Sequence, residues 1–111
     1  MKEARLLIGG EWQDGVERVD VLDKFLLTPF ARMHIPSRQQ VRTAVAAAHD
    51  AYVQSTLTAY DRGAILDRAA QIVERDGEKF VERIRAEAGF TKTDAQNEVR
   101  RCMQTFRVSA D

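Results

Sequence analysis

The sequence changes from one periodicity to another within Ala31-Arg32-Met33-His34-Ile35-Pro36-Ser37-Arg38-Gln39-Gln40. Up to Ile35, apolar and polar residues alternate, which is the pattern of a half-buried strand. Pro36 ends that strand because proline has no amide hydrogen to donate. Ser37 and Gln40 have the spacing of a capping box, so a helix is predicted to begin there. The chain is therefore predicted to be α+β, with strands and hairpins in residues 1–36 and helices in residues 37–111.

Before this transition, the pattern predicts short strands joined by tight turns. Leu6-Leu7-Ile8 and Glu11-Trp12 are separated by Gly9-Gly10, and glycine adopts the positive φ of a hairpin turn without steric strain. Asp14-Gly15 predicts a second turn of the same kind. The alternation around Val19 and Val21 then predicts a half-buried strand.

After the transition, apolar residues recur at spacings of three and four, which predicts four amphipathic helices. They are expected to begin after Ser37, near Thr58, after Asp76-Gly77 and at Thr93, and Gly89 is predicted to end the third with a left-handed cap. The predicted inner faces are Val41, Ala44, Val45, Ala48, Ala51 and Tyr52; Ile65, Ala69, Ile72 and Val73; Phe80, Val81, Ile84 and Ala88; and Ala95, Val99, Cys102, Met103, Phe106 and Ala110.

The fourth stripe runs to the penultimate residue without a glycine or proline stop signal. We therefore expect the chain to be part of a longer protein. Three side chains carry separate expectations. Trp12 is expected to anchor a core, His34 to lie on the exposed face of its strand, and Cys102 to be a small core hydrophobe.

The composition is that of one globular domain with no charge bias. The 111 residues include 17 basic and 17 acidic side chains. This balance argues against nucleic acid and against a membrane as partners, and no apolar run is long enough to span a bilayer. One cysteine cannot form an internal disulfide, so a reducing, cytoplasmic location is expected.

No catalytic constellation is written in these residues. The six glycines form neither a dinucleotide-binding fingerprint nor a Walker loop. His34 and His49 lack cysteine or acidic neighbours at zinc-ligand spacing. Cys102 lies within a helix rather than at a helix N-terminus, where a thiol would be activated. We therefore predict no catalytic and no cofactor-binding residue.

Five stretches, taken together, resemble the NAD(P)-dependent aldehyde dehydrogenases in order and spacing. They are Leu6–Trp12, the alanine-rich Val41–Tyr52, Asp61–Leu66, Glu87-Ala88-Gly89, and Glu98–Arg101 followed by Thr105-Phe106-Arg107. The last pattern is similar to members that act on lactaldehyde, phosphonoacetaldehyde or phosphorylated aldehydes. Two loops depart from the family. Asp23–Pro29 replaces the usual Asn-Pro-x-Thr-Gly-Glu, and Phe90-Thr91 replaces Lys-Pro.

The resemblance implies that residues 1–111 form the N-terminal portion of an α/β Rossmann-type coenzyme-binding domain. In the family, a cysteine thiolate attacks the aldehyde, hydride passes from the resulting thiohemiacetal to NAD or NADP, and water releases the acid. The residues for this chemistry follow the matched region, so none is carried onto this chain, and Cys102 does not correspond to the nucleophile. The chain alone is expected to bind no cofactor and to be inactive. Its expected partners are the remainder of the dehydrogenase chain and further copies, through exposed apolar helix faces.

The resemblance also implies one structural site for a monovalent cation. In some members, a carboxylate at the position of Glu87 and a backbone carbonyl near Leu22 contribute to it. Hard cations prefer such oxygen ligands, although two are too few to form a site alone.

An alternative hypothesis is a stand-alone helical module that dimerises or binds a partner helix through its apolar stripes, without catalysis. The two hypotheses differ in whether the reading frame continues into a glycine-rich turn and a nucleophilic cysteine. A DNA-binding helix-turn-helix is disfavoured by the charge balance.

Overall fold

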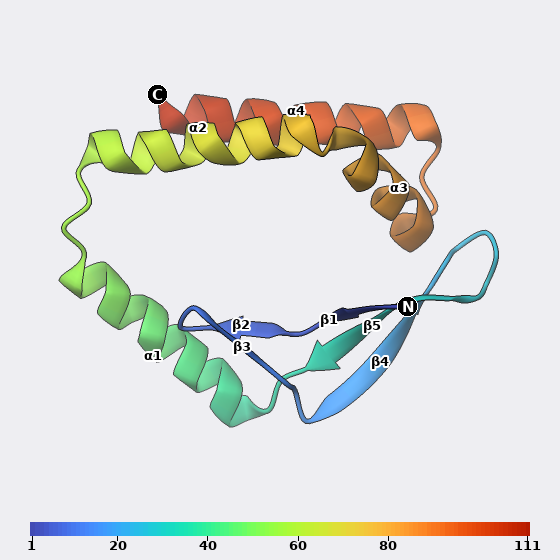
Figure 1. Ribbon diagram of the computed structural model, residues 1–111, viewed down its shortest axis with the longest axis horizontal. Helices are drawn as coiled ribbons and strands as arrows, with labels where there is room; N and C mark the ends of the chain where they lie inside the picture. Colours follow the sequence, from blue (N-terminus) through green and yellow to red (C-terminus); the bar gives the residue numbers. More distant parts are fainter. The chain divides into compact units, whose positions relative to one another are not determined.

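The computed structural model describes all 111 residues, which form two compact units, residues 1–56 and 57–111. The first unit holds five short strands and helix α1 (Arg38–Gln54), and the second holds three helices (Figure 1). The predicted α+β class is confirmed, with every strand before Pro36 and every helix after Ser37.

A three-stranded sheet forms the centre of the first unit. Its order is β1 (Lys2–Ala4), β5 (Pro29–Ile35) and β4 (Glu17–Leu22), with β1 parallel and β4 antiparallel to β5. Strand β1 was not predicted because its three residues are all exposed and two are charged, so it lacks the apolar alternation that marks a strand.

Strands β2 (Leu6–Ile8) and β3 (Glu11–Gln13) pair as a separate two-stranded antiparallel sheet. Gly9 and Gly10 between them both have positive φ, so the predicted hairpin is confirmed. The second hairpin, predicted at Asp14-Gly15, is wrong because β3 and β4 lie in different sheets. Gly15 is needed for another reason. A Cβ atom there would lie 2.3 Å from the carbonyl oxygen of Ile35.

The capping box that begins α1 is confirmed. The Ser37 hydroxyl accepts from the Gln40 amide at 3.0 Å, and the Ser37 amide donates to Gln40 Oε1 at 2.9 Å. The predicted inner face of α1 is wrong for this chain, since no residue of the helix is buried. Val41, Val45 and Tyr52 are 49%, 64% and 81% exposed.

The second unit has a small apolar core between α2 (Ala59–Arg75), α3 (Gly77–Ala88) and α4 (Lys92–Ala110). Helices α2 and α4 lie side by side (Figure 1). Val73, Val81, Ala95 and Val99 are buried there, and four half-buried residues pack against them: Phe80, Ile84, Met103 and Phe106. These eight residues confirm the centre of the predicted stripes.

The edges of those stripes are corrected. Ile65 and Ile72 are 54% and 36% exposed, and α2 instead buries Ala70 completely. Ala88 is exposed, and Ala86, two residues earlier on the opposite face of α3, is buried. The buried faces of α2 and α3 are narrower than their apolar stripes, because each of these helices packs closely against α4 and only weakly against the other.

Helix ends in this unit follow the predicted signals closely. The Thr58 hydroxyl accepts from the Asp61 amide at 3.1 Å and the Thr58 amide donates to Asp61 Oδ2 at 2.9 Å, which confirms the second cap. The hydrogen bond that the Thr58 amide donates lowers the pKa of Asp61. The cap therefore contributes stability at neutral pH, and this stability is lost as the pH falls through the lowered pKa. Gly89 has φ 72°, as predicted. Helix α4 begins at Lys92 rather than Thr93, because Thr91 supplies the cap.

Candidate functional site

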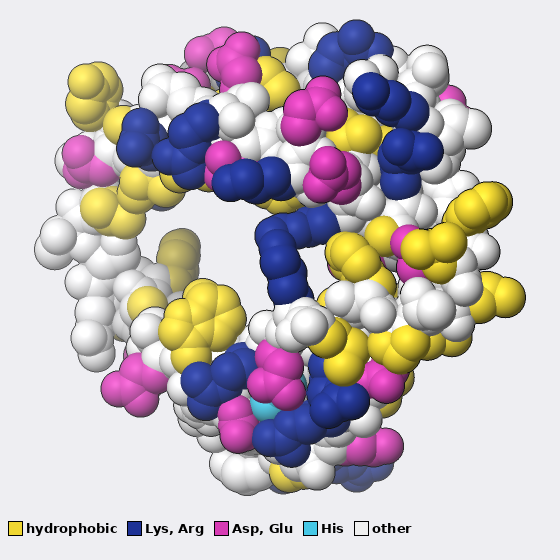
Figure 2. Space-filling model, turned by 45° about the vertical axis from the view of Figure 1, so that its right-hand side comes forward, with side chains coloured by type: hydrophobic (Ala, Val, Ile, Leu, Met, Phe, Trp, Pro, Cys, Tyr) yellow, Lys and Arg dark blue, Asp and Glu magenta, His cyan; other side chains and the backbone are white.

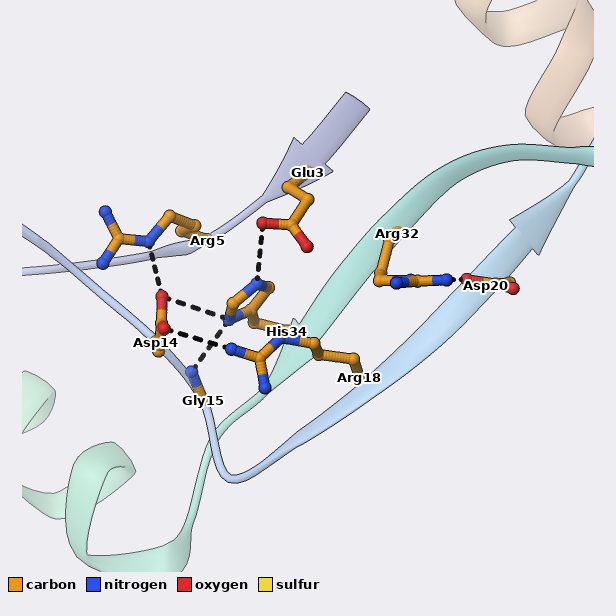
Figure 3. Close-up of polar contacts among 8 residues, drawn as sticks. All are labelled: Glu3, Arg5, Asp14, Gly15, Arg18, Asp20, Arg32 and His34. Atoms are coloured by element: carbon orange, nitrogen blue, oxygen red, sulfur yellow. Dashed lines mark hydrogen bonds and ion pairs between the residues drawn. The ribbon is translucent and has the colours of Figure 1, made fainter. Parts of the chain in front are cut away.

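His34 is the centre of the most connected polar cluster in the chain (Figure 3). Its side chain is completely buried, so the prediction that it lies on the surface is wrong. The strand alternation indicated the correct face, but Glu3 from the unpredicted strand β1 and the segment Asp14-Gly15 cover that face. One sequence signal could have indicated this cluster. His34 lies opposite Arg18 in the register of β4 and β5, so a titratable ring and a charged side chain share one face of the sheet.

The two imidazole nitrogens of His34 have different surroundings. Nδ1 accepts a hydrogen bond from the Gly15 amide at 3.0 Å and lies 3.8 Å from Asp14 Oδ1. Nε2 has no hydrogen-bond partner, and Glu3 Oε2 lies 3.6 Å from it. Since the two carboxylates face opposite edges of the ring, they cannot close around one metal ion with it. No cluster of three or more metal-binding side chains occurs in the structure.

Two arginines hold Asp14 in place: Arg5, between β1 and β2, and Arg18 on β4. Arg5 Nε lies 2.7 Å from Asp14 Oδ1, and one Arg18 guanidinium nitrogen lies 3.1 Å from Oδ2. The hydrogen bond from Arg5 lowers the pKa of Asp14, and the charges of Arg5 and Arg18 act in the same direction. The cluster joins β1, β4, β5 and the segment before β4 through ion pairs and hydrogen bonds.

The residues predicted to bind a cation lie in separate units. The Leu22 carbonyl, in the first unit, accepts from Lys24 Nζ at 2.8 Å. Glu87 is exposed on α3 in the second unit. Next to Leu22, Asp23 Oδ1 accepts from the amides of Phe25 and Leu26 at 2.8 Å each, and these bonds lower the pKa of Asp23. An ammonium group therefore already satisfies the carbonyl that the cation would need.

Two further expectations about single side chains are wrong. Trp12 is 62% exposed, and its cross-strand partner Leu7 is 57% exposed. Cys102 is a free, exposed thiol rather than a core residue. Both residues lie on faces that nothing in their own unit covers. A sequence pattern can indicate that a face is apolar without showing which segment covers it.

A shallow hollow in the second unit runs beside α4. It is lined by Phe90, Asp94, Asn97, Glu98, Arg100, Arg101 and Gln104. Both arginines are engaged locally: Arg101 pairs with Glu98 at 2.9 Å and Arg100 donates to Asn97. The hollow therefore offers no unpaired basic group for an anionic ligand.

Exposed apolar side chains are the most extensive feature of both units. Figure 2 shows hydrophobic side chains standing at the surface beside charges of both signs. The most exposed of them are Phe25 at 90%, Tyr60 at 84%, Tyr52 at 81%, Val108 at 74% and Leu27 at 71%. Apolar surface on this scale marks sites where other protein packs. None of the helices is long and apolar enough to cross a membrane.

Comparison with protein families and their curated members gives a consistent result. The model described as the aldehyde dehydrogenase family matches residues 12–111. A 3-sulfolactaldehyde dehydrogenase from Priestia aryabhattai is 32% identical over 111 residues, which are 100% of this chain and 23% of that protein. Aspartate-semialdehyde dehydrogenase 1 of Pseudomonas canavaninivorans is 40% identical over 57 residues, 51% of this chain and 12% of its own length.

Solved structures match almost the whole chain. A NAD-dependent benzaldehyde dehydrogenase from Corynebacterium glutamicum superposes with a TM-score of 0.87 and 29% identity, covering 94% of this chain and 23% of its own. A 3,6-anhydro-L-galactose dehydrogenase in complex with NAP gives a TM-score of 0.93 at 20% identity, covering 99% of this chain and 24% of its own. At that identity the second match supports the fold alone. The chain thus spans less than a quarter of the proteins that it matches over most of its length.

Proposed function

Because this chain belongs to the aldehyde dehydrogenase family, we propose that it is the structural N-terminal segment of an enzyme that oxidises an aldehyde to a carboxylic acid with NAD or NADP. The observation that carries the proposal is the match over the whole chain to 23% of a dehydrogenase. The exposed apolar faces support it, because a segment that packs against a larger body leaves such faces open when it is considered alone.

The chain's own contribution to this activity is structural. It has neither a glycine-rich turn for a pyrophosphate nor a positioned nucleophile, since Cys102 is exposed on α4 with no neighbouring base in hydrogen-bond contact. When bound, the coenzyme accepts the hydride; the residues of this chain orient neither that coenzyme nor the aldehyde. Its strands and helices instead supply apolar surface for the domain that does.

We propose a small polar aldehyde of the lactaldehyde type as the substrate of the complete enzyme. Support comes from the C-terminal pattern around Glu98–Arg101 and Thr105–Arg107, and from the relative that acts on 3-sulfolactaldehyde and is similar along the whole chain. The Asp23–Pro29 loop departs from the usual family pattern, and nothing in its geometry relates to substrate choice.

The chain alone is expected to be catalytically silent. Incubation with NAD or NADP and a panel of small aldehydes should give no increase in absorbance at the reduced-nicotinamide band above that of a blank without protein. Turnover that scales with chain concentration would contradict the proposal. We also propose that the chain self-associates through its exposed apolar faces, which light scattering on the same preparation would measure. We propose a cytoplasmic location for the complete protein.

A monovalent cation at the Leu22 carbonyl remains a proposal of the same kind. Lys24 Nζ donates to that carbonyl at 2.8 Å, and its positive charge opposes the binding of a second cation at the same oxygen. For each variant, the melting temperature is measured in potassium and in a matched concentration of tetramethylammonium. The difference between the two should be larger for Lys24→Met than for the parent chain. Arg42→Met, which removes a positive charge from the exposed surface of α1, is the control. An equal potassium response in both variants would exclude Leu22 as a ligand.

A further inference from the structure

His34 is the only buried polar residue in the chain and the only one with an unpartnered buried side-chain nitrogen. Because Nδ1 accepts the Gly15 amide at 3.0 Å, the neutral ring must carry its proton on Nε2. That proton points toward Glu3, whose nearest oxygen is 3.6 Å away, too long for a hydrogen bond. The neutral ring therefore makes one hydrogen bond and leaves its second polar atom unsatisfied.

The charged groups on this side of the sheet come from every surrounding segment. They are Glu3 on β1, Arg5 between β1 and β2, Asp14 before β4, Arg18 and Asp20 on β4, and Arg32 on β5. The three arginines are engaged: Arg5 and Arg18 bind Asp14, and Arg32 binds Asp20 at 2.8 Å. Glu3 is the carboxylate left over, and His34 is its ion-pair partner within 4 Å.

A second proton on His34 would have to go onto Nδ1, the atom that now accepts from Gly15. Nδ1 would then be a donor facing another donor, so the Gly15 hydrogen bond could not persist. Two carboxylate oxygens lie near the ring nitrogens and can accept from the protonated ring. Asp14 Oδ1 lies 3.8 Å from Nδ1, and Glu3 Oε2 lies 3.6 Å from Nε2.

We propose that His34 is a pH-operated latch, in which the neutral imidazole holds the Gly15 amide and the imidazolium releases it to pair with Asp14 and Glu3. The proposal goes beyond the aldehyde dehydrogenase function and does not depend on it, because all of its residues lie in the first unit.

The release would act on the connection between the two sheets. Asp14 and Gly15 join β3 of the hairpin to β4 of the three-stranded sheet. Besides the two arginines on the Asp14 side chain, three hydrogen bonds to the backbone of residues 14–16 fasten this connection: the Gly15 amide to His34, the Val16 amide to the Ile35 carbonyl at 3.0 Å, and Gln40 Nε2 to the Asp14 carbonyl at 2.9 Å. Protonation removes the first of them and moves the Asp14 side chain toward the ring, which loosens the hairpin from the sheet.

The test is amide hydrogen exchange of the full chain, followed by NMR at several pH values between 7.5 and 5. The protection factor of the Gly15 amide should fall about five- to tenfold across this range, as expected for one lost hydrogen bond, and the Val16 amide should change less. His34→Asn is the matched variant. Its side-chain oxygen can still accept from Gly15 but cannot be protonated, so its Gly15 protection should stay within about twofold of constant.

Two further measurements keep the result interpretable. Glu3→Gln removes the acceptor on the Nε2 side, so the loss of Gly15 protection should shift to lower pH. The imidazole ¹⁵N shifts of His34, recorded over the same pH series, should show the second ring nitrogen gaining its proton together with the loss of Gly15 protection. Unchanged Gly15 protection in the native chain would overturn the proposal, and so would an equal loss of protection in His34→Asn.

Discussion

Replacing Ala70→Asp is expected to unfold the second unit. Ala70 has no exposed surface and lies on the part of α2 that is packed inside the unit. A carboxylate there would be buried without a partner, which costs at least about 3 kcal/mol. The whole free energy of unfolding of a small domain is about 5–15 kcal/mol, and this unit of 55 residues, 57–111, has only a small core. A single charge should therefore remove most of its stability.

The measurement is urea denaturation followed by the helical circular dichroism signal. The Ala70→Asp variant should lose a large part of its helical signal before urea is added. Gln71→Asp is the control because it places the same carboxylate on the next residue, which is exposed, and it should stay within about 0.5 kcal/mol of the parent after the helix propensity of Asp is allowed for. Equal stability of the two variants would mean that α2 does not pack as the structure shows.

Replacing Val45→Glu is expected to have a small effect on the isolated chain and a large effect in a complete dehydrogenase. Val45 is 64% exposed in this chain, so the substitution should change the stability of the isolated chain by about 0.5 kcal/mol or less. In a complete dehydrogenase the same position would be covered, and a buried, unpaired glutamate would be strongly unfavourable. Val41, Val45, Ala48 and Tyr52 form one exposed row along α1 at helical spacing, so a charge at its centre should disrupt the whole contact.

The second setting is a chimera of the Priestia aryabhattai 3-sulfolactaldehyde dehydrogenase, in which this chain replaces the segment that aligns with it. Val45→Glu should lower the yield or the activity of the folded chimera at least about tenfold. Thr43→Glu is the control, because Thr43 is also exposed but lies on the opposite side of α1. If both glutamates were tolerated alike in the chimera, the α1 row would not be an interface.

The elements that could be predicted from the sequence are those fixed by local chemistry. Ser37 with Gln40 and Thr58 with Asp61 mark helix starts because each pair satisfies backbone amides within one turn. Gly9 and Gly10 mark the hairpin because its turn needs positive φ at both residues. The buried centres of α3 and α4 follow from the 3.6-residue period in the same way.

The features that could not be predicted depend on partners distant in sequence. Strand β1 forms by pairing in parallel with the edge of β5. Its own three residues lack the apolar alternation that would predict a strand. His34 is buried by this strand and by the connection through Gly15. Gly63 had no local role in the sequence; in the structure, a Cβ atom there would lie 2.7 Å from the Ala110 carbonyl oxygen, where α2 and α4 approach closely. Trp12 and Val45 were predicted to be buried but are exposed in this chain. We expect the segments that cover them to lie in another part of a dehydrogenase.

The central claim is that this chain is a folded segment whose apolar faces fit the body of an aldehyde dehydrogenase. The most direct test is the aldehyde-dependent rate of NADH or NADPH formation by the chimera, compared with the same relative lacking the aligned segment. We predict that the chimera oxidises 3-sulfolactaldehyde at a rate at least about tenfold above the background rate measured with the truncated enzyme. A chimera that folds, as judged by circular dichroism and gel filtration, and is no more active than the truncated enzyme would contradict the claim.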